Sequence, residues 1–319
     1  MPSLQRILLL LSLFLLMPIA HAEGPSFLSR LPAEWSPAQL ARSASFEIES
    51  RHTGQRYRVL LGIPFSAAPK AGYPVLWALD GLASFPTMEA FRPRQPREQT
   101  RVADAWRERA AGQVRDGLIV AVGYASGEPF NVDARALDYT PEPQAPTGDL
   151  LSPRHGGAEA FLAFLTEELR PLLAEYFPMD PQRHTLFGFS YGALFTLHTL
   201  STQPQYFQRY WAASPSLWFA DHQTIKALPQ RLKALDFAAA PVRVTITVGR
   251  DEQYPEQFAS ANIREQLQVR TMVDNVHRFA QLLQEKPGTQ VTTFDLPGSD
   301  HYDMLQHGAR HVLAFAFAP

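Results

Sequence analysis

The sequence of 319 residues contains no cysteine. This excludes disulfide bonds, a thiolate nucleophile and a cysteine-based zinc site. The formal net charge is only −2, which gives no electrostatic reason to expect a nucleic-acid partner. Beyond residue 22 no apolar run is long enough to cross a bilayer, so we expect no stable insertion into a membrane. Stability must therefore come from a hydrophobic core, which a composition of 45% apolar and 11% aromatic residues can fill.

The first 22 residues are typical of a secretory signal peptide. A single positive charge, Arg6, precedes an apolar stretch over residues 7–16 that is too short to span a membrane. The segment ends in the small-x-small sequence formed by Ala20 and Ala22. We expect cleavage after Ala22 and export of a soluble mature chain of residues 23–319. Because no cysteine follows the predicted cleavage site, a lipid anchor is not expected.

A Gly-x-Ser-x-Gly sequence lies at Gly188, Ser190 and Gly192. A short apolar run precedes it and a helix-forming segment follows it, which is the arrangement of a nucleophile elbow. A side chain at either glycine is expected to collide with the neighbouring strand or helix. We therefore predict Ser190 as a nucleophile beside the N–H groups of the following helix, which favour negative charge. The alternative is an ordinary strand-to-helix turn with an incidental serine.

Predicted strands alternate with predicted helices along the mature chain. Residues 45–50 and 57–64 flank a turn and predict an antiparallel hairpin at a sheet edge. The alternation that follows predicts one α/β domain over residues 23–319, with a mainly parallel sheet, helices on both faces and ligands at the carboxyl ends of the strands. The later strands are expected at 73–79, 117–123, before Ser190, 210–215, 242–248 and 290–296, and the helices at 157–176, after Ser190, 225–235, 261–283 and 304–317.

A serine nucleophile needs a general base, and ten histidines compete for this role. His301 lies in the loop predicted after the last strand, so it should emerge at the same sheet edge as Ser190. It also occupies the place of the histidine in the chain order serine, acid, histidine. His198 is closer to Ser190 in the sequence, but it lies two turns down the predicted helix and points away. We therefore predict His301 as the base.

The base in turn needs a carboxylate that holds its tautomer and stabilises the imidazolium. The loop after residues 242–248 contains Asp251 and Glu252 and should open at the same edge. Glu252, which follows Gly249 by three positions, fits the usual placement of the acid. Asp251 is the alternative, and a pair of serine and histidine without a close acid also remains open.

The negative charge that develops on the substrate oxygen needs two hydrogen-bond donors. The backbone N–H of Tyr191, directly after the nucleophile, is the first prediction. The second is the backbone N–H of Leu82, in the turn that follows the strand at residues 73–79. The alternative for this turn is a plain Asp80-Gly81 turn without a catalytic part.

Two connecting segments are long and polar. Residues 92–115 are rich in arginine, and acidic residues interleaved at helical spacing favour a solvated face. Residues 124–155 have many turn formers and predict a long loop, and loops of this length are usually functional. The arginines considered in the first segment are Arg92, Arg94, Arg97, Arg101, Arg107 and Arg109.

A set of short motifs in this chain resembles a known family, the "putative esterase" family of α/β-hydrolases. Within it the chain is most similar to the periplasmic siderophore esterases that hydrolyse enterobactin and related catecholate trilactones. The resemblance covers essentially the mature chain, although many relatives carry histidine in place of Phe189 and asparagine in place of Leu82. The motifs are Leu79-Asp-Gly-Leu-Ala-Ser-Phe85, Arg135-x-x-Asp138-Tyr-Thr-Pro141, Gly156-Gly-Ala158, the elbow and Ser214-Pro-Ser-Leu-Trp-Phe219.

The resemblance implies an α/β-hydrolase fold, a periplasmic location and catalytic roles for Ser190 and His301. It places Arg135 and Trp218 near the substrate. We expect neither a cofactor nor a metal. Some siderophore esterases are described as using only a serine and a histidine, which keeps the role of Glu252 open.

The function predicted from these observations is hydrolysis of the trilactone of a catecholate siderophore such as ferric enterobactin, which would promote iron release. Such a substrate is a bulky aromatic trianion, so its site needs cations and aromatic faces, which Arg135, Trp218 and part of the arginine-rich segment could supply. Alternatively, Arg135 pairs with Asp138 and braces its own loop. The rival functions are a general exported acyl esterase or acyltransferase, and a siderophore-binding protein without turnover.

Overall fold

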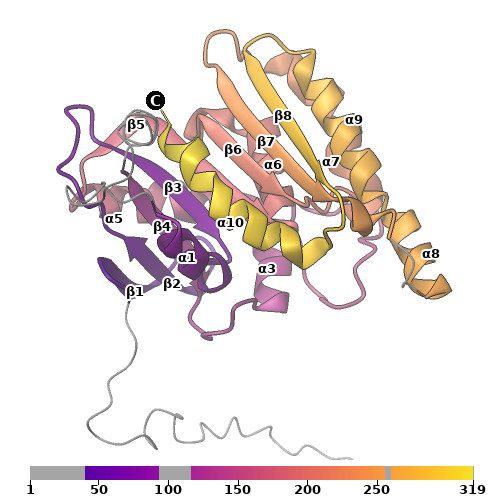
Figure 1. Ribbon diagram of the computed structural model, residues 1–319, viewed down its shortest axis with the longest axis horizontal. Coiled ribbons are helices and arrows are strands. Elements are labelled where there is room, and N and C mark those ends of the chain that lie inside the picture. The colour runs from indigo at the N-terminus through magenta and orange to yellow at the C-terminus, as the bar shows by residue number, and fades with distance from the viewer. Residues whose placement is uncertain (1–39, 93–115, 256–259, 319) are drawn as a thin grey trace, which may run out of the picture. The chain divides into compact units, whose positions relative to one another are not determined.

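The centre of the molecule is a sheet of short apolar strands, seen in a computed structural model that describes residues 40–92, 116–255 and 260–318 (Figure 1). The predicted signal peptide and most of the arginine-rich segment lie outside the described residues. The eight strands of the sheet are β1 (Ser43–Glu49), β2 (Arg56–Gly62), β3 (Tyr73–Leu79), β4 (Leu118–Tyr124), β5 (Met179–Phe189), β6 (Arg209–Ala213), β7 (Val242–Gly249) and β8 (Thr289–Leu296).

The strands are arranged in the order β1-β2-β4-β3-β5-β6-β7-β8. The pairs β1–β2 and β2–β4 are antiparallel, and every other pair is parallel. The predicted hairpin at the edge of a mainly parallel sheet is therefore confirmed. Side chains are buried along the whole of β4 and β6, as expected for parallel strands covered on both faces, whereas the edge strand β8 alternates between more and less exposed residues.

Helices cover both faces of this sheet, as predicted. In Figure 1, α1 and α10 lie in front of it, while α6 and α7 lie behind. Each layer has its own hydrophobic core, one built by α1 and α10 with the strands and the other by helices that include α3, α6, α7 and α9. The helices are α1 (Gly81–Ala90), α3 (Val132–Tyr139), α4 (Ala158–Ala163), α5 (Arg170–Ala174), α6 (Tyr191–Thr202), α7 (Phe219–Ala234), α8 (Ala261–Arg270), α9 (Met272–Gln284) and α10 (His301–Phe317).

Three connections differ from the sequence-based expectations. The helix expected over 157–176 contains a π-helical turn, Phe164–Leu169, between α4 and α5. The long loop expected over 124–155 contains the helix α3, which Asn131 begins by accepting a hydrogen bond from the Ala134 N–H. The single helix expected over 261–283 is two helices, because Thr271 has a left-handed backbone conformation with φ 45°.

The break at Thr271 has a physical reason in the two sequences that it separates. The segment α9 has a continuous apolar face, and its residues Val276, Phe279 and Leu283 are buried against the sheet. The segment α8 has only scattered apolar positions among polar ones, so it gains little by continuing along the same face. The turn at Thr271 instead directs α8 away from the sheet, as Figure 1 shows.

Candidate active site

The nucleophile elbow forms as predicted at the end of β5. Ser190 has φ 58° and ψ −116°, a conformation that is strained for a residue with a side chain, and α6 begins directly after it. The Ser190 N–H donates to the Ala213 carbonyl over 2.9 Å, which ties the turn to β6. A Cβ at Gly188 would overlap the Gly192 carbonyl, so this position requires glycine. At Gly192 the prediction was wrong, because a Cβ there would make only ordinary contacts with Leu79.

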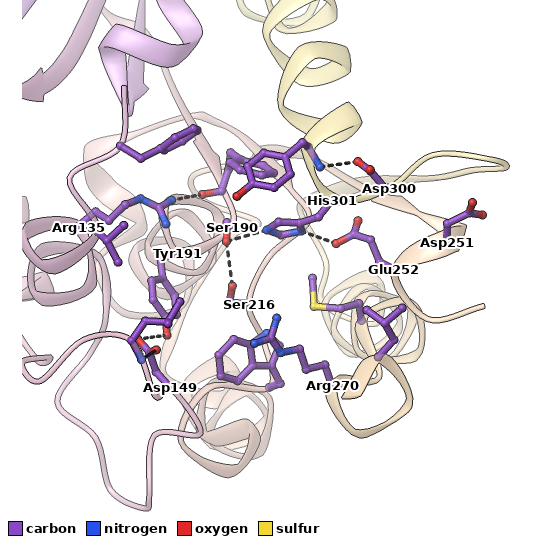
Figure 2. Close-up of a pocket in the computed structure, with 18 residues that line it drawn as sticks. Arg135, Asp149, Ser190, Tyr191, Ser216, Asp251, Glu252, Arg270, Asp300 and His301 are labelled. Atoms are coloured by element: carbon purple, nitrogen blue, oxygen red, sulfur yellow. Dashed lines mark hydrogen bonds and ion pairs between the residues drawn. The ribbon is translucent and has the colours of Figure 1, made fainter. Parts of the chain in front are cut away.

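The predicted base and acid lie beside this serine (Figure 2). His301 Nε2 is 3.0 Å from Ser190 Oγ, and His301 Nδ1 is 2.5 Å from Glu252 Oε2. Glu252 is almost fully buried, whereas the His301 side chain remains 36% exposed and can be reached from the cleft. The structure therefore brings the three predicted side chains into the geometry of a catalytic triad.

Glu252, rather than Asp251, is the carboxylate that reaches His301. A short 3₁₀ turn, Arg250–Glu252, follows β7 and directs Glu252 inward, and Figure 2 shows Asp251 farther from His301. The second Glu252 oxygen accepts hydrogen bonds from the Ser214 hydroxyl at 2.5 Å and from the Gly249 N–H at 2.9 Å. These bonds hold the carboxylate in place, and a carboxylate at this distance from His301 favours a triad over serine and histidine alone.

His301 is the first residue of α10, not part of a loop as predicted. Asp300 begins the helix by accepting hydrogen bonds from the Tyr302 and Asp303 N–H groups, and the Asp303 carboxylate accepts from the Asp300 N–H. Such a capping box fixes the first turn of a helix, and with it the backbone of His301. Gly249 contributes from the other side, because a Cβ there would overlap the Ser299 carbonyl and push the start of α10 away from β7.

The alternative base, His198, is held elsewhere. Its Nε2 lies 2.8 Å from Glu159 Oε1, and its Nδ1 lies 3.5 Å from the Arg231 guanidinium. The side chain is buried and does not line the cleft that contains Ser190. The prediction that His198 points away from the elbow is thus confirmed.

This geometry is suited to acyl transfer. Since the ionised Glu252 accepts the Nδ1 proton of His301, the Nε2 lone pair is free to take the proton of Ser190. The Ser190 oxygen can then attack an ester carbonyl, and the imidazolium can return the proton to the departing alcohol. Water activated by the same imidazole would release the acyl group, so ester hydrolysis needs no other acid or base.

Three further residues at this site were not assigned a role from the sequence. Ser214 holds the acid, and Ser216 Oγ lies 3.3 Å from Ser190 Oγ. The Phe189 ring packs against the His301 imidazole with ring centroids 4.7 Å apart. Ser214 and Ser216 follow β6, which neighbours β5, so their place at the carboxyl ends of adjacent parallel strands was a signal that could have revealed them.

The two predicted oxyanion donors have different outcomes. Tyr191 begins α6 and lines the cleft next to Ser190, where the first N–H groups of the helix are available. Leu82 lies in the first turn of α1 and packs close to Gly123, and it is not among the described residues that line the cleft. The structure thus does not bring the Leu82 side chain to the site, and its backbone role stays a prediction.

Arg135 lines the cleft, but its charge is used within the protein. Its Nε and Nη2 atoms donate to the two oxygens of the buried Asp80 carboxylate over 3.0 and 2.9 Å, and Nη2 also donates to the Phe189 carbonyl. Burial lowers the pKa of Arg135, but the Asp80 carboxylate outweighs this and raises it. Arg135 therefore joins α3 to the ends of β3 and β5. The alternative pairing with Asp138 was wrong.

Asp138 instead accepts hydrogen bonds from two tyrosine hydroxyls, Tyr57 at 2.7 Å and Tyr124 at 3.2 Å. Burial raises the pKa of Asp138 to about 6, although both hydroxyls act in the opposite direction by stabilising the charged form. This carboxyl group lies inside the protein under α3 and is not among the residues that line the cleft.

The triad opens onto a cleft of about 590 Å³. The segment expected to be a functional loop supplies much of its lining, including Phe130, Val132, Asp149 and Leu151. The predicted substrate contact Trp218 also lines the cleft, and the Arg270 guanidinium lies 4.6 Å from the centre of its ring.

Asp149 anchors the connecting segment of residues 124–155 to Tyr191, the residue that follows Ser190. Its carboxylate accepts from the Tyr191 hydroxyl over 2.9 Å and lies 3.1 Å from His155 Nε2. Burial alone would raise the pKa of Asp149, but hydrogen bonds from the Leu151 N–H, His155 and Tyr191 lower it. Burial and the Asp149 charge together raise the pKa of the Tyr191 hydroxyl, which therefore stays protonated. The aromatic wall beside Ser190 is thus held in one position.

The arginine-rich segment contributes only Arg92 to the described residues. This side chain is buried, and it forms ion pairs with Glu89 and Asp116 at 2.7 and 2.8 Å. It is not solvated, so that expectation was wrong for this residue, and it does not line the cleft. The other arginines of the segment lie outside the described residues. Within the described ranges there is also no group of three or more acidic, histidine or cysteine side chains that could hold a metal ion. The same residues include no helix of the length and hydropathy needed to span a bilayer.

Comparisons with known proteins agree with this geometry. Residues 50–301 match the protein family described as "Putative esterase". Ferri-bacillibactin esterase BesA of Bacillus subtilis (strain 168) is 31% identical over 281 residues, which cover 85% of this chain and 88% of BesA. The apo-salmochelin esterase of Escherichia coli O6:H1 is 28% identical over 263 residues, covering 81% of this chain and 74% of the relative.

Similarity extends to solved structures. The crystal structure of the BES protein from Bacillus cereus superposes with a TM-score of 0.70 at 26% identity, covering 89% of this chain and 99% of that one. Agreement over nearly the whole of that chain indicates a shared arrangement of strands and helices around the cleft.

Proposed function

The chain belongs to the family described as "Putative esterase", and on that premise we propose that this serine carboxylic-ester hydrolase cleaves the ester bonds of siderophores. The observation that carries the proposal is the contact of Ser190 with His301, and of His301 with Glu252, at the base of an open cleft. Two relatives along most of the chain are named for siderophore esters, which supports this substrate class over simple esters.

Within that class we propose a catecholate trilactone such as enterobactin as the substrate. The cleft offers flat aromatic faces for its aryl groups and has room for a bulky ligand. The macrocycle holds the iron-binding groups in a preorganised arrangement, so opening one ester bond weakens the hold on iron and promotes its release. The aromatic residues of the cleft are Phe130, Phe189, Tyr191, Trp218 and Tyr302.

The location that we propose is the periplasm. It rests on the signal-peptide pattern of residues 1–22, which would direct residues 23–319 across the inner membrane. Cell fractionation of the full-length protein, with N-terminal sequencing of the mature form, tests this part by itself. A cytoplasmic protein that keeps residues 1–22 would contradict it.

The substrate is tested with purified residues 23–319 and both iron-free and ferric enterobactin, with the products read by mass spectrometry. We expect a linear trimer that contains one added water, and none with Ser190→Ala. A short-chain chromogenic ester serves as the comparison. Cleavage of that ester but of neither trilactone would favour a general acyl esterase and overturn the siderophore assignment. Tight binding of a trilactone without turnover would favour a binding protein.

A further inference from the structure

The two described arginines that line the cleft differ in whether a carboxylate of the protein neutralises them. Of the two arginines among the described residues that line it, Arg135 is neutralised by Asp80. Arg270 has no carboxylate partner among the described residues, and its side chain lies at the exposed end of α8 over the Trp218 ring. Arg270 is thus the cation of the described cleft that is available to an incoming anion, a residue that the sequence patterns did not single out.

The Trp218 side chain, over which the Arg270 guanidinium lies, is held rigidly. One part of its ring packs against Gly148, which has φ 72° and where a Cβ would come within 3.4 Å of the indole. The ring centroid lies 6.0 Å from that of Tyr191. Directly after Trp218 the backbone makes a left-handed turn, in which the Ala220 N–H donates to the Thr147 carbonyl over 3.1 Å. The indole face is therefore a preformed surface rather than a mobile side chain.

The charged groups of the cleft are unevenly placed. In Figure 2 Asp251 and Asp300 lie beyond His301, whereas Arg270 lies below Ser216. The third aspartate that lines the cleft, Asp149, lies beside Tyr191, and its carboxylate is already bound by the Tyr191 hydroxyl and by His155. An anionic ligand would be repelled by Asp251 and Asp300 and attracted by Arg270. A substrate with its ester carbonyl at Ser190 would therefore place negative charge toward Arg270.

We propose that Arg270 and Trp218 form an anion-accepting aryl subsite that binds an iron-coordinated catecholate group and makes the enzyme prefer the ferric siderophore. This proposal rests on the proposed function and adds the basis of discrimination between the two forms of the substrate. The relatives do not indicate which form this protein prefers, because one is named for a ferric siderophore and another for an iron-free one.

The chemistry of the ligand explains why one arginine discriminates. Catechol hydroxyls keep their protons at neutral pH when free and lose them when they coordinate a metal ion, as metal ligands generally do. Iron loading thus converts a neutral trilactone into a trianion. The planar guanidinium donates to two adjacent oxygens at once, and the aromatic side chains around it, Trp218 and Tyr191, pack against the aryl ring. The first interaction gains strength only with the charged ligand, whereas the second is available to both forms.

Binding is measured in the Ser190→Ala background, so that turnover does not interfere, by calorimetric titration with ferric and iron-free enterobactin. We expect Arg270→Gln to weaken binding of the ferric form about tenfold and that of the iron-free form about twofold or less. Arg270→Lys, which keeps the charge but not the planar fork, should fall between. The matched control is Arg264→Gln, an exposed arginine on the same helix that does not line the cleft, and it should leave both affinities unchanged.

The result that overturns the subsite is equal weakening of both forms by Arg270→Gln, or an equal effect of Arg264→Gln on the ferric form. Circular dichroism and thermal melts of each variant exclude misfolding as the cause. If the unsubstituted enzyme opens the trilactone while Arg270→Gln keeps the ferric preference, the subsite falls and the proposed function stands. If the unsubstituted enzyme opens no trilactone, the proposed function falls, and the titrations still decide whether Arg270 selects the ferric anion.

Discussion

The two ends of the central sheet both contain buried charged or polar groups, but the chain treats them differently. At the carboxyl ends of β3, β5 and β6, Asp80, Ser190 and Ser214 have positive φ values of 50°, 58° and 48° although none is glycine. At the amino ends of β5 and β6, Arg183 and Arg209 donate to the last carbonyls of α10. Backbone strain is thus concentrated at the carboxyl ends of the strands. At the amino ends, arginine side chains satisfy the hydrogen-bonding needs of the last helix carbonyls.

The helix α10 connects the two ends. Its first residue is His301, the predicted base, and its last carbonyls are the ones that Arg183 and Arg209 bind. One end of this helix therefore serves chemistry and the other serves stability. Residues at the catalytic end should be needed for rate and cost little stability when replaced, and residues at the other end should show the reverse.

The largest expected effect is at the nucleophile. Ser190→Ala removes the attacking oxygen, so kcat/KM for ester hydrolysis should fall by about 10⁴-fold or more. The melting temperature should change by no more than about 2 °C, because among the described residues the serine hydroxyl forms hydrogen bonds only with His301 and Ser216. Steady-state kinetics and calorimetric melts measure the two quantities. Retained hydrolysis would remove Ser190 from the mechanism.

A smaller loss of rate is expected for the acid. Glu252→Gln cannot stabilise the imidazolium and perturbs the tautomer of His301, so kcat should fall about 10²- to 10⁴-fold. The matched control is Asp251→Asn, which should retain activity within about threefold, since Asp251 makes no hydrogen bond to His301. The same kinetic assay compares the two variants, and a larger loss in Asp251→Asn would reverse their assignment.

The amino end of the sheet should show the opposite behaviour. Arg209→Met removes donors to the carbonyls of Phe315, Ala316 and Ala318, and we expect the free energy of unfolding to fall by about 4 kcal/mol. The kcat of the folded fraction at 25 °C should stay within about threefold of the parent. Urea unfolding and active-site titration measure these values, with Lys233→Gln, an exposed position, as the control. Lost kcat at unchanged stability would contradict the division between the ends.

The smallest effect is expected from Asp138 and depends on pH. Its folded-state pKa of about 6 exceeds the ordinary value of 3.8, so the folded protein binds the proton more tightly than the unfolded chain. The stability that this proton contributes is complete below about pH 4 and is lost as the pH rises through about 6. Asp138→Asn removes this dependence, so its stability relative to the parent should rise by up to about 3 kcal/mol between pH 4 and 7.

Urea unfolding at a series of pH values tests this expectation. Asp133→Asn, an exposed position in the first turn of the same helix, should show no such relative gain. If the stability difference between Asp138→Asn and the parent stays constant with pH, the Asp138 carboxyl group is not protonated at a raised pKa. Its bonds to the two tyrosine hydroxyls would then be those of an ionised group.

Much of the catalytic end could be predicted because its members follow strands. In a mainly parallel sheet the residues after each strand meet at one edge, so Ser190, Glu252 and His301 could be brought together from their order alone. The partner of Arg135 could not be predicted in this way. Asp138 lies one helical turn from it in the sequence, but the Asp80 carboxylate reaches it from β3. The prediction that Arg92 is solvated failed for a similar reason. Its ion-pair partner Asp116 is 24 positions away in the sequence, so no local spacing indicated the contact.

By itself the sequence determined the α/β class and predicted the nucleophile and the order of the triad, because these depend on local periodicity and on the residues that follow each strand. Only the tertiary structure decided which carboxylate reaches His301, that Arg135 forms an ion pair with Asp80 and that Arg270 lies over Trp218. Those contacts join residues from different elements, and their distances depend on how the elements pack against one another and on backbone turns such as the one at Thr271. The candidate catalytic residues of this cleft could therefore be predicted from the sequence. Which arginine has its charge available to a ligand depends on tertiary packing.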